Sequence, residues 1–175
     1  MKHKEYYIPF SGLKQGKHRF DYIIENKFFE SFGYNEFNDA HIELNVMLNK
    51  TSTMLELDFD AEGTVNVDCD LTNEPYDQPV ASELQLVVKF GDEFNDDDDE
   101  ILIIPHGEHQ VNIAQYIYEM LVLAVPQKRV HPGIADGTLK SDALDRLAEL
   151  GPKESENKED NDPRWDALKK LLTDK

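Results

Sequence analysis

The side chains of this sequence that could carry chemistry are mainly carboxylates, with two neighbouring histidines. Asp96–Asp99 form an uninterrupted aspartate run, and His106 and His109 stand three residues apart. A calcium loop alternates its ligands, needs a turn glycine and ends in a bidentate glutamate, so consecutive aspartates cannot all face one ion. The two histidines lack further ligands at a typical metal-site spacing. We interpret both segments as solvated loops and predict no metal site.

Cys69 is the single cysteine, which excludes an internal disulfide and is typical of a reducing cytoplasm. It continues the alternation of Val65 and Val67, which favours a small inward-facing residue. We expect Asp68 and Asp70 to raise the pKa of its thiol by like-charge repulsion. Nucleotide-binding, nucleophile-elbow and zinc-peptidase motifs do not occur. The sequence therefore predicts no catalytic residue, no cofactor and no enzymatic activity.

The net charge of −18, from 36 acidic and 18 basic residues, argues against a nonspecific binder of nucleic-acid phosphates. We predict no DNA partner, and the charge favours a soluble protein or one whose partner is basic. Candidate binding residues are the few clustered cations, Trp165, and Glu119 on an otherwise apolar helix. They are Lys14, Lys17, Arg19, Glu119, Lys128, Arg129, His131, Arg164, Trp165 and Lys169. Ordinary solvated charge is the alternative for these cations, and Lys128 and Arg129 would suit a helix C-terminus.

One helix, residues 112–125, should organise the fold. Its apolar positions recur at helical spacing, at Ile113, Ile117, Met120, Leu121 and Ala124. Asn112 is the expected N-cap, with Gln115 as a loose capping box, and Pro126 should end the helix. Further apolar residues, Tyr116, Val122, Leu123 and Val125, predict a helix buried on more than one side.

Strands should supply the rest of the core. Alternating apolar residues predict a hairpin over 42–61, with a bulge or bend at Gly63, and a strand over 84–90 that follows a loop with Pro75 and Pro79. Shorter strands are expected at 6–10, 18–25 and 101–104, and a short helix capped by Asn26 should end at Gly33. These elements predict an α+β fold in which a mostly antiparallel, curved β-sheet or partly open barrel packs on the central helix.

The domain prediction is a β-rich globular domain over 1–132, a flexible acidic tether over 133–162 and a C-terminal amphipathic helix over 163–173. Asp162 and Pro163 begin that helix, and Trp165, Leu168, Leu171 and Leu172 share a face. This face could pack on the chain's own sheet or in a partner's groove. A signal peptide and an apolar run of membrane-spanning length are absent, so we expect a cytoplasmic protein with no membrane partner.

Three motifs in this order resemble the YceD-like family of large ribosomal RNA subunit accumulation proteins. They are Cys69-Asp70, the Tyr116–Glu119 block running into Leu123–Pro126, and Asp162–Trp165 with Leu168-Lys169. The resemblance covers Tyr7–Leu172, and Lys128–Pro132 is similar to versions from Bacteroidetes-type bacteria. It implies a non-enzymatic accessory factor in large-subunit ribosomal RNA accumulation or processing, a step of ribosome biogenesis. The implied partner is ribosomal RNA or a large-subunit ribosomal protein.

Family members commonly show a Cys-x-Arg-Cys motif where this chain has Cys69–Thr72, and further cysteines where it has His131. Two cysteine pairs could form a zinc site, but one thiol remains here, so we expect no metal. Because naked RNA should repel this acidic chain, we favour contact through a basic ribosomal protein, or through a small cationic patch with the acidic loop held away. The alternatives are a general adaptor that docks through its C-terminal helix, and a metal-dependent hydrolase with converging carboxylates.

Overall fold

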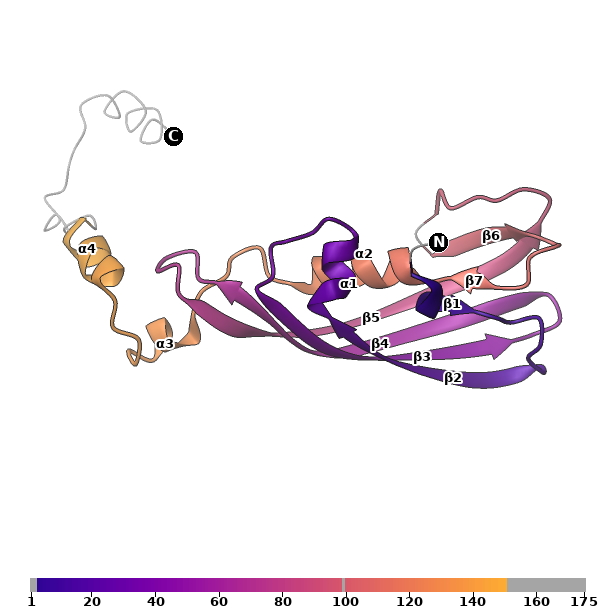
Figure 1. Cartoon of the computed structure of the whole chain (residues 1–175), viewed down its shortest axis with the longest axis horizontal. Coiled ribbons are helices and arrows are strands. Elements are labelled where there is room, and N and C mark those ends of the chain that lie inside the picture. Colours follow the sequence, from indigo (N-terminus) through magenta and orange to yellow (C-terminus); the bar gives the residue numbers. More distant parts are fainter. Residues whose placement is uncertain (1–2, 99, 151–175) are drawn as a thin grey trace, which may run out of the picture. The chain divides into compact units, whose positions relative to one another are not determined.

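The computed structural model describes residues 3–98 and 100–150. The chain divides into two compact units, Met1–Leu139 and Lys140–Lys175, and each is described by itself. The first unit holds every strand of the described chain (Figure 1). Among the described residues, the helices are too short or too polar to cross a membrane.

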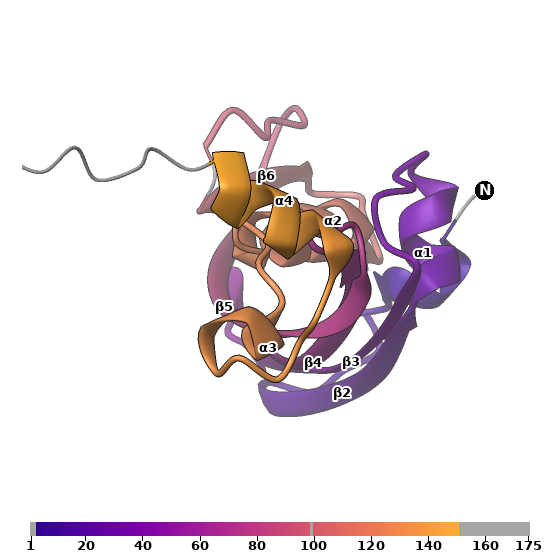
Figure 2. The same ribbon diagram turned by 90° about the vertical axis from the view of Figure 1, so that its left-hand side faces the viewer.

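A five-stranded sheet forms the body of the first unit. Its strands are β2 (Gly16–Glu25), β3 (Asp39–Lys50), β4 (Met54–Asp68), β5 (Pro75–Gly91) and β6 (Ile101–Pro105). The order is β2-β3-β4-β5-β6, with β6 parallel to β5 and every other pair antiparallel. Seen along the strands, β2 to β5 curve into a trough with α2 (Ala114–Ala124) over its open side (Figure 2). The predicted α+β class is confirmed, and the sheet is open.

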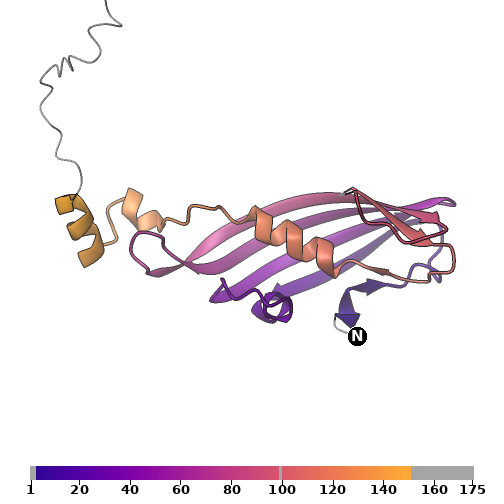
Figure 3. The same cartoon turned by 90° about the horizontal axis from the view of Figure 1, so that it is seen from above.

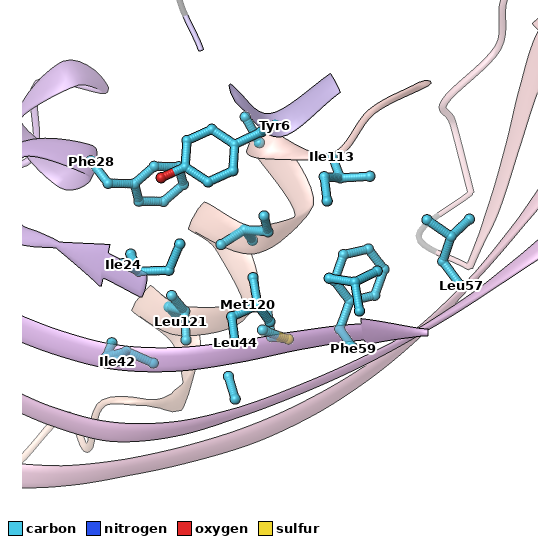
Figure 4. Packing of buried hydrophobic residues seen from close by; sticks show 14 of the residues in the cluster. Tyr6, Ile24, Phe28, Ile42, Leu44, Leu57, Phe59, Ile113, Met120 and Leu121 are labelled. Atoms are coloured by element: carbon cyan, nitrogen blue, oxygen red, sulfur yellow. The ribbon is translucent and has the colours of Figure 1, made fainter. Parts of the chain in front are cut away.

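The trough has one apolar face because apolar and polar residues alternate along its strands. In β3 and β4 the alternate side chains that face the core are at most 5% exposed. They are Ala40, Ile42, Leu44, Val46, Leu48, Leu55, Leu57, Phe59, Ala61, Val65 and Val67. α2 lies across this face, as seen from above in Figure 3. Met120 and Leu121 point from α2 toward the sheet, beside Leu44 and Ile42 (Figure 4).

The N-terminal segment positions the start of α2. After a 3-10 turn, η1 (Lys4–Tyr6), strand β1 (Tyr7–Ile8) pairs antiparallel with β7 (Val111–Asn112). The backbone N–H of Ile113 donates to the Tyr6 carbonyl at 3.0 Å. Helix α1 (Asn26–Ser31) buries Phe28 against the Tyr6 ring, with 4.9 Å between ring centroids (Figure 4). Its N-cap is Glu25 and not the expected Asn26, whose amide donates to Glu30 at 3.2 Å.

One expectation about the central strands was wrong, and of the bulge or bend expected at Gly63 the bulge does not occur. Pro75 and Pro79 lie inside β5 and not in a loop. Proline is tolerated there because β5 pairs with β4 alone, among the described residues, until its ladder with β6 begins at Val87. Gly63 causes no bulge, since the pairing with Ile42 continues without an extra residue. A Cβ at Gly63 would lie 2.3 Å from the His41 carbonyl oxygen, so glycine permits a close approach of β3.

The central helix also differs from its prediction. α2 begins at Ala114 with Ile113 as N-cap, although the Asn112 side chain does accept the N–H of Ala114 at 2.9 Å. Gln115 completes no capping box, because its amide donates forward to Glu119 at 2.6 Å. Besides the sheet, the helix packs on Phe32 through Tyr118, with 4.5 Å between ring centroids, but Leu123 is 83% exposed. Only one side of α2 meets the sheet, and Leu123 lies on the other.

Two further helices overlap the range 133–162, which was predicted to be a flexible tether. α3 (Pro132–Ala135) belongs to the first unit, and the His131 side chain caps it by accepting the N–H of Gly133 at 2.9 Å. α4 (Asp142–Leu150) belongs to the second unit and buries none of its side chains within the described chain. The expected C-terminal helix over 163–173, with Arg164, Trp165 and Lys169, lies outside the described residues.

Candidate functional site

The first unit carries a groove of about 880 Å³ between α2, the middle of β5 and the segment around β6. This size lies within the roughly 300–1,000 Å³ typical of ligand-binding pockets. Its lining comes from four stretches of the chain and one residue near the N-terminus. They are 82–84, the loop residues 94–98, 102–105, and 108–124, together with Tyr7. The groove therefore exists only in the folded chain.

Apolar side chains form much of this groove. Leu102, Ile104 and Met120 line it from the core, and Leu84 and Ala124 lie at its sides. Two other lining residues face solvent, because Leu123 is 83% and Phe94 is 59% exposed. Large exposed apolar side chains gathered around one concavity are typical of an interaction surface.

The charges around the groove have one sign. Five lining residues are acidic, and none of the described lining residues is Lys, Arg or His. The acidic residues are Glu83, Asp96, Asp98, Glu108 and Glu119. Burial raises the pKa of the Tyr116 hydroxyl, and the nearby carboxylates of Asp96 and Glu119 raise it further. The Asp96 carboxylate of the acidic loop and the Glu119 carboxylate of α2 therefore both lie near the Tyr116 hydroxyl.

Hydrogen bonds hold the acidic residues in place. The amide of Gln115 donates to Glu119 one turn further along α2, at 2.6 Å. Asn95 pairs with Ile103 of β6 through both backbone groups, at 3.0 and 2.8 Å. The Asn95 side chain donates to Asp97 at 2.8 Å, and Asp98 accepts the N–H of Glu100 at 2.9 Å. The acidic loop, expected to be only a solvated connection, is anchored to the outer edge of β6.

A second cluster joins the end of β4 to the segment after α2. The N–H of Asp70 donates to the Arg129 carbonyl at 2.8 Å, and the N–H of Arg129 donates to the Asp70 carboxylate at 2.7 Å. The Arg129 guanidinium lies 3.9 Å from Asp70 and 3.7 Å from Glu36. Two of the candidate cations, Arg129 and His131, therefore have structural contacts, while Lys128 is exposed.

Cys69 belongs to this cluster, where the N–H of His131 donates to its sulfur at 3.3 Å. Burial by itself raises the pKa of the Cys69 thiol, but hydrogen bonds from His131, Thr72 and Leu71 outweigh it and lower the pKa below its usual value. The expected increase caused by Asp68 and Asp70 was wrong. Within the described chain, His131 meets the thiol through its backbone N–H, while its imidazole nitrogen accepts the N–H of Gly133. These residues do not fit a zinc site.

Across residues 3–98 and 100–150, no three His, Cys, Asp or Glu side chains gather in a way that could hold a metal ion. His106 instead stacks on the Phe90 ring, with 6.3 Å between ring centroids, and the His109 carbonyl accepts the N–H of Ser11. The part of the chain that the structure describes therefore offers no observation in favour of a metal-dependent hydrolase.

The other candidate cations of the described chain lie at the other end of the sheet. Lys14, Lys17 and Arg19 precede or begin β2, where Gly16 pairs with Lys50 at the last residue of β3. Arg19 is paired with Asp21, with 2.9 Å between Nη2 and Oδ1. β3 has 12 residues, and at about 3.3 Å per residue its two ends are about 36 Å apart. The Lys14–Arg19 cations therefore do not join Lys128 in one patch.

Two functional features were missed by the sequence analysis. Lys50, not considered before, donates to the carbonyls of Phe10 at 2.8 Å and Leu13 at 2.9 Å and so fixes the first turn. The groove was missed as a whole, although Glu119 was singled out because it interrupts an apolar helix. The exposed Leu123 beside it carried no separate signal, since its spacing suited burial equally well.

A family model described as "Large ribosomal RNA subunit accumulation protein YceD" matches residues 57–172, more than half of the chain. The chain belongs to this family, as its motifs predicted. The match begins within β4, so β1, β2, α1 and β3 lie before it, while β5, β6 and α2 lie inside. Neither a curated protein nor a solved structure matches the chain.

Proposed function

We propose that this YceD-family chain is a cytoplasmic accessory factor in the accumulation of large-subunit ribosomal RNA, and that it acts by binding a basic ribosomal protein. The family description supports the first part, since it names an accumulation protein and no reaction. The observation that carries the second part is the acidic groove, whose described lining includes five acidic residues and no Lys, Arg or His.

The distribution of charge favours protein over RNA as the direct partner. A phosphate backbone needs several cations along one surface. Here the Lys14–Arg19 cluster and Lys128 lie at opposite ends of β3, and both Arg19 and Arg129 are already paired with carboxylates. Ribosomal proteins carry the opposite charge to this chain of net charge −18 and would be attracted over a long range.

Binding of this kind would shield a basic protein until it meets its ribosomal RNA. An unassembled cationic segment exposes both charge and apolar side chains, and a groove with carboxylates at its rim and apolar side chains inside can cover both. The accumulation of large-subunit ribosomal RNA would then depend on the supply of that protein in a competent state.

Affinity capture of the tagged full-length chain, with and without RNase, tests the proposal. We expect large-subunit ribosomal proteins to stay bound after the RNA is digested. If they are lost with the RNA, direct contact with a ribosomal protein is wrong. Depletion of the chain in cells should also lower large-subunit relative to small-subunit ribosomal RNA, and an unchanged ratio would refute the accumulation role.

A further inference from the structure

We propose that the groove beside α2 binds an extended peptide segment of a protein partner, in which lysine or arginine residues accompany apolar side chains, and that this segment pairs with the open edge of β5. This inference rests on the proposed function for the identity of the partner. It adds the place of binding, the conformation of the bound segment and the chemistry that selects it.

The first argument is charge complementarity. Carboxylates line the groove from the acidic loop and from α2, represented by Asp96, Asp98 and Glu119. The hydrogen bonds of Gln115 and Asn95 hold the helix and loop contributions in position, so the partner does not have to order them. Several fixed charges of one sign around a concavity select a partner of opposite sign and reject acidic ones.

The second argument concerns the apolar part of the groove. Leu123 on α2 and Phe94 in the acidic loop are the two large apolar lining residues that stay largely exposed. A purely polar cation, such as a chain of lysines alone, would leave both uncovered. An apolar side chain placed between them would remove exposed hydrocarbon from water, at about 25 cal/mol per Å².

The third argument is the open strand edge. The ladder between β5 and β6 begins at Val87, whose N–H donates to the Glu100 carbonyl. Backbone groups alternate in direction along a strand, so those of Gln85 and Glu83 point the same way as those of Val87. Within the described chain no strand meets them, and Glu83 lines the groove. An added strand could take these hydrogen bonds.

The prolines of β5 mark where such pairing would stop. Pro75 and Pro79 lie nearer the start of the strand, and proline cannot donate to a neighbouring strand. The stretch from Val80 to Leu86 contains no proline and lies next to the groove. The edge is therefore blocked where no groove exists and open where the groove lies, which favours a partner strand at this one place.

The test uses the full-length chain and three fluorescent synthetic peptides of equal length. The first alternates lysine with valine or leucine, and the second alternates lysine with serine. The third alternates glutamate with valine or leucine. Fluorescence anisotropy should show binding of the first peptide, at least tenfold weaker binding of the second, and none of the third. Equal binding of the first two peptides would overturn the role of the apolar residues. Binding of the acidic peptide would overturn charge selection.

Matched variants locate the site. D96N/D98N/E119Q should weaken binding of the first peptide at least tenfold, while D58N/D60N/E62Q should change it less than twofold. The second triple removes the same charge from exposed positions of β4 on the other face of the sheet. Leu123→Ser should weaken binding severalfold, and Ile23→Ser, at a residue that is 52% exposed on β2, should not. Equal effects of the two triples would overturn the groove as the site.

Backbone pairing is tested with peptides N-methylated at every second residue. One methylation register should abolish binding and the other should preserve it, because only alternate N–H groups face β5. Equal loss in both registers would overturn strand addition. The W165A/L168A variant tests whether the chain's own C-terminal segment occupies the groove. If this variant binds the alternating lysine–apolar peptide more than tenfold more tightly, the groove belongs to that segment and the partner peptide is overturned as occupant. An unchanged affinity supports the partner.

Failure of this inference can be told from failure of the proposed function. If RNase-resistant capture of ribosomal proteins persists in D96N/D98N/E119Q, the function stands and the groove is not the site. If the alternating peptide binds the groove but no ribosomal protein is captured, the groove stands and the proposed partner is wrong.

Discussion

Asp70 and Arg129 are joined by their backbones as well as by their side chains. Each N–H of the pair donates to the other residue, at 2.8 Å to the Arg129 carbonyl and at 2.7 Å to the Asp70 carboxylate. The guanidinium lies 3.9 Å from the same carboxylate. The segment after α2 is thereby held to the end of β4, and it places His131 over Cys69.

Replacing Asp70 should loosen this attachment. Asp70→Ala removes the carboxylate that accepts the N–H of Arg129, so we expect the free energy of unfolding to fall by about 1–3 kcal/mol. Asp70→Asn keeps an acceptor oxygen and should cost less. Chemical denaturation measures both losses, with Asp58→Ala, an exposed aspartate in the middle of β4, as a control that should lose no stability.

The reactivity of the Cys69 thiol shows whether the segment around His131 has moved away from β4. Cys69 is the single cysteine of the chain and is 2% exposed, so alkylation requires the segment around His131 to move away. The alkylation rate should rise in Asp70→Ala and stay low in Asp58→Ala. An unchanged rate in Asp70→Ala would show that the Arg129 segment stays in place without this carboxylate.

The sequence was sufficient to predict the strands of the trough, because alternate residues of β3 and β4 have no other way to bury their apolar side chains. It was not sufficient for the first half of β5. Pro75 and Pro79 are typical of loops, and only the sheet order shows that they lie on a free edge. A proline in a loop and a proline on a free strand edge have the same local sequence pattern.

The groove could not be predicted for a different reason. Leu121 and Leu123 are two residues apart on α2, and both suited an apolar helix. Which of them faces solvent depends on where the sheet and the acidic loop lie, and these come from distant parts of the chain. Glu119, with Gln115 one turn before it, was the local sign that a side of this helix is not covered.

These two leucines provide a matched pair for mutation. Leu121 is 0% and Leu123 is 83% exposed. Leu121→Ala should lower the free energy of unfolding by about 2–5 kcal/mol, since it leaves a cavity in the core. Leu123→Ala should change it by no more than about 0.5 kcal/mol. Urea denaturation of both variants is the measurement, and a large loss in Leu123→Ala would mean that this side chain is part of the core.

Acidic residues lie opposite each other on the outer face of the sheet and repel one another. Asp60 lies opposite Glu83 on β5, and Glu62 lies opposite Glu43 on β3. Like charges directly opposite each other are destabilising, so Asp60→Asn and Glu62→Gln should each raise the free energy of unfolding by about 0.2–1 kcal/mol. The gain should shrink at high salt, which screens exposed charges. Thermal unfolding at low and high salt measures it.

Asp21 provides the control of opposite sign on the same face. It accepts hydrogen bonds from Arg19 at 2.9 Å and from Asn45 at 2.7 Å, and these bonds lower the pKa of its carboxyl group. Asp21→Asn should therefore lower the melting temperature while the other two neutralisations raise it. A rise in all three variants would show that net charge, and not the cross-strand neighbour, sets the effect.

Tyr6 should make the fold sensitive to alkaline pH. Burial, followed by the charge of Glu5, raises the pKa of its hydroxyl from 10.0 to about 12. The unfolded chain releases this proton near pH 10, whereas the folded chain holds it until about pH 12. Between these values the unfolded state binds fewer protons, so the free energy of unfolding falls as the pH rises. This contribution is complete below pH 10 and is lost by about pH 12.

Tyr6→Phe removes the ionisable group and keeps the ring, which packs 4.9 Å from Phe28 between centroids. Its free energy of unfolding should therefore decline less steeply than that of the unmodified chain between pH 10 and about 12. Part of the decline should persist, because burial also raises the pKa of Tyr22. Urea denaturation at pH steps through this range gives both slopes. Equal slopes would mean that Tyr6 ionises as readily in the folded as in the unfolded chain, and that the hydroxyl reaches water despite the burial of its ring.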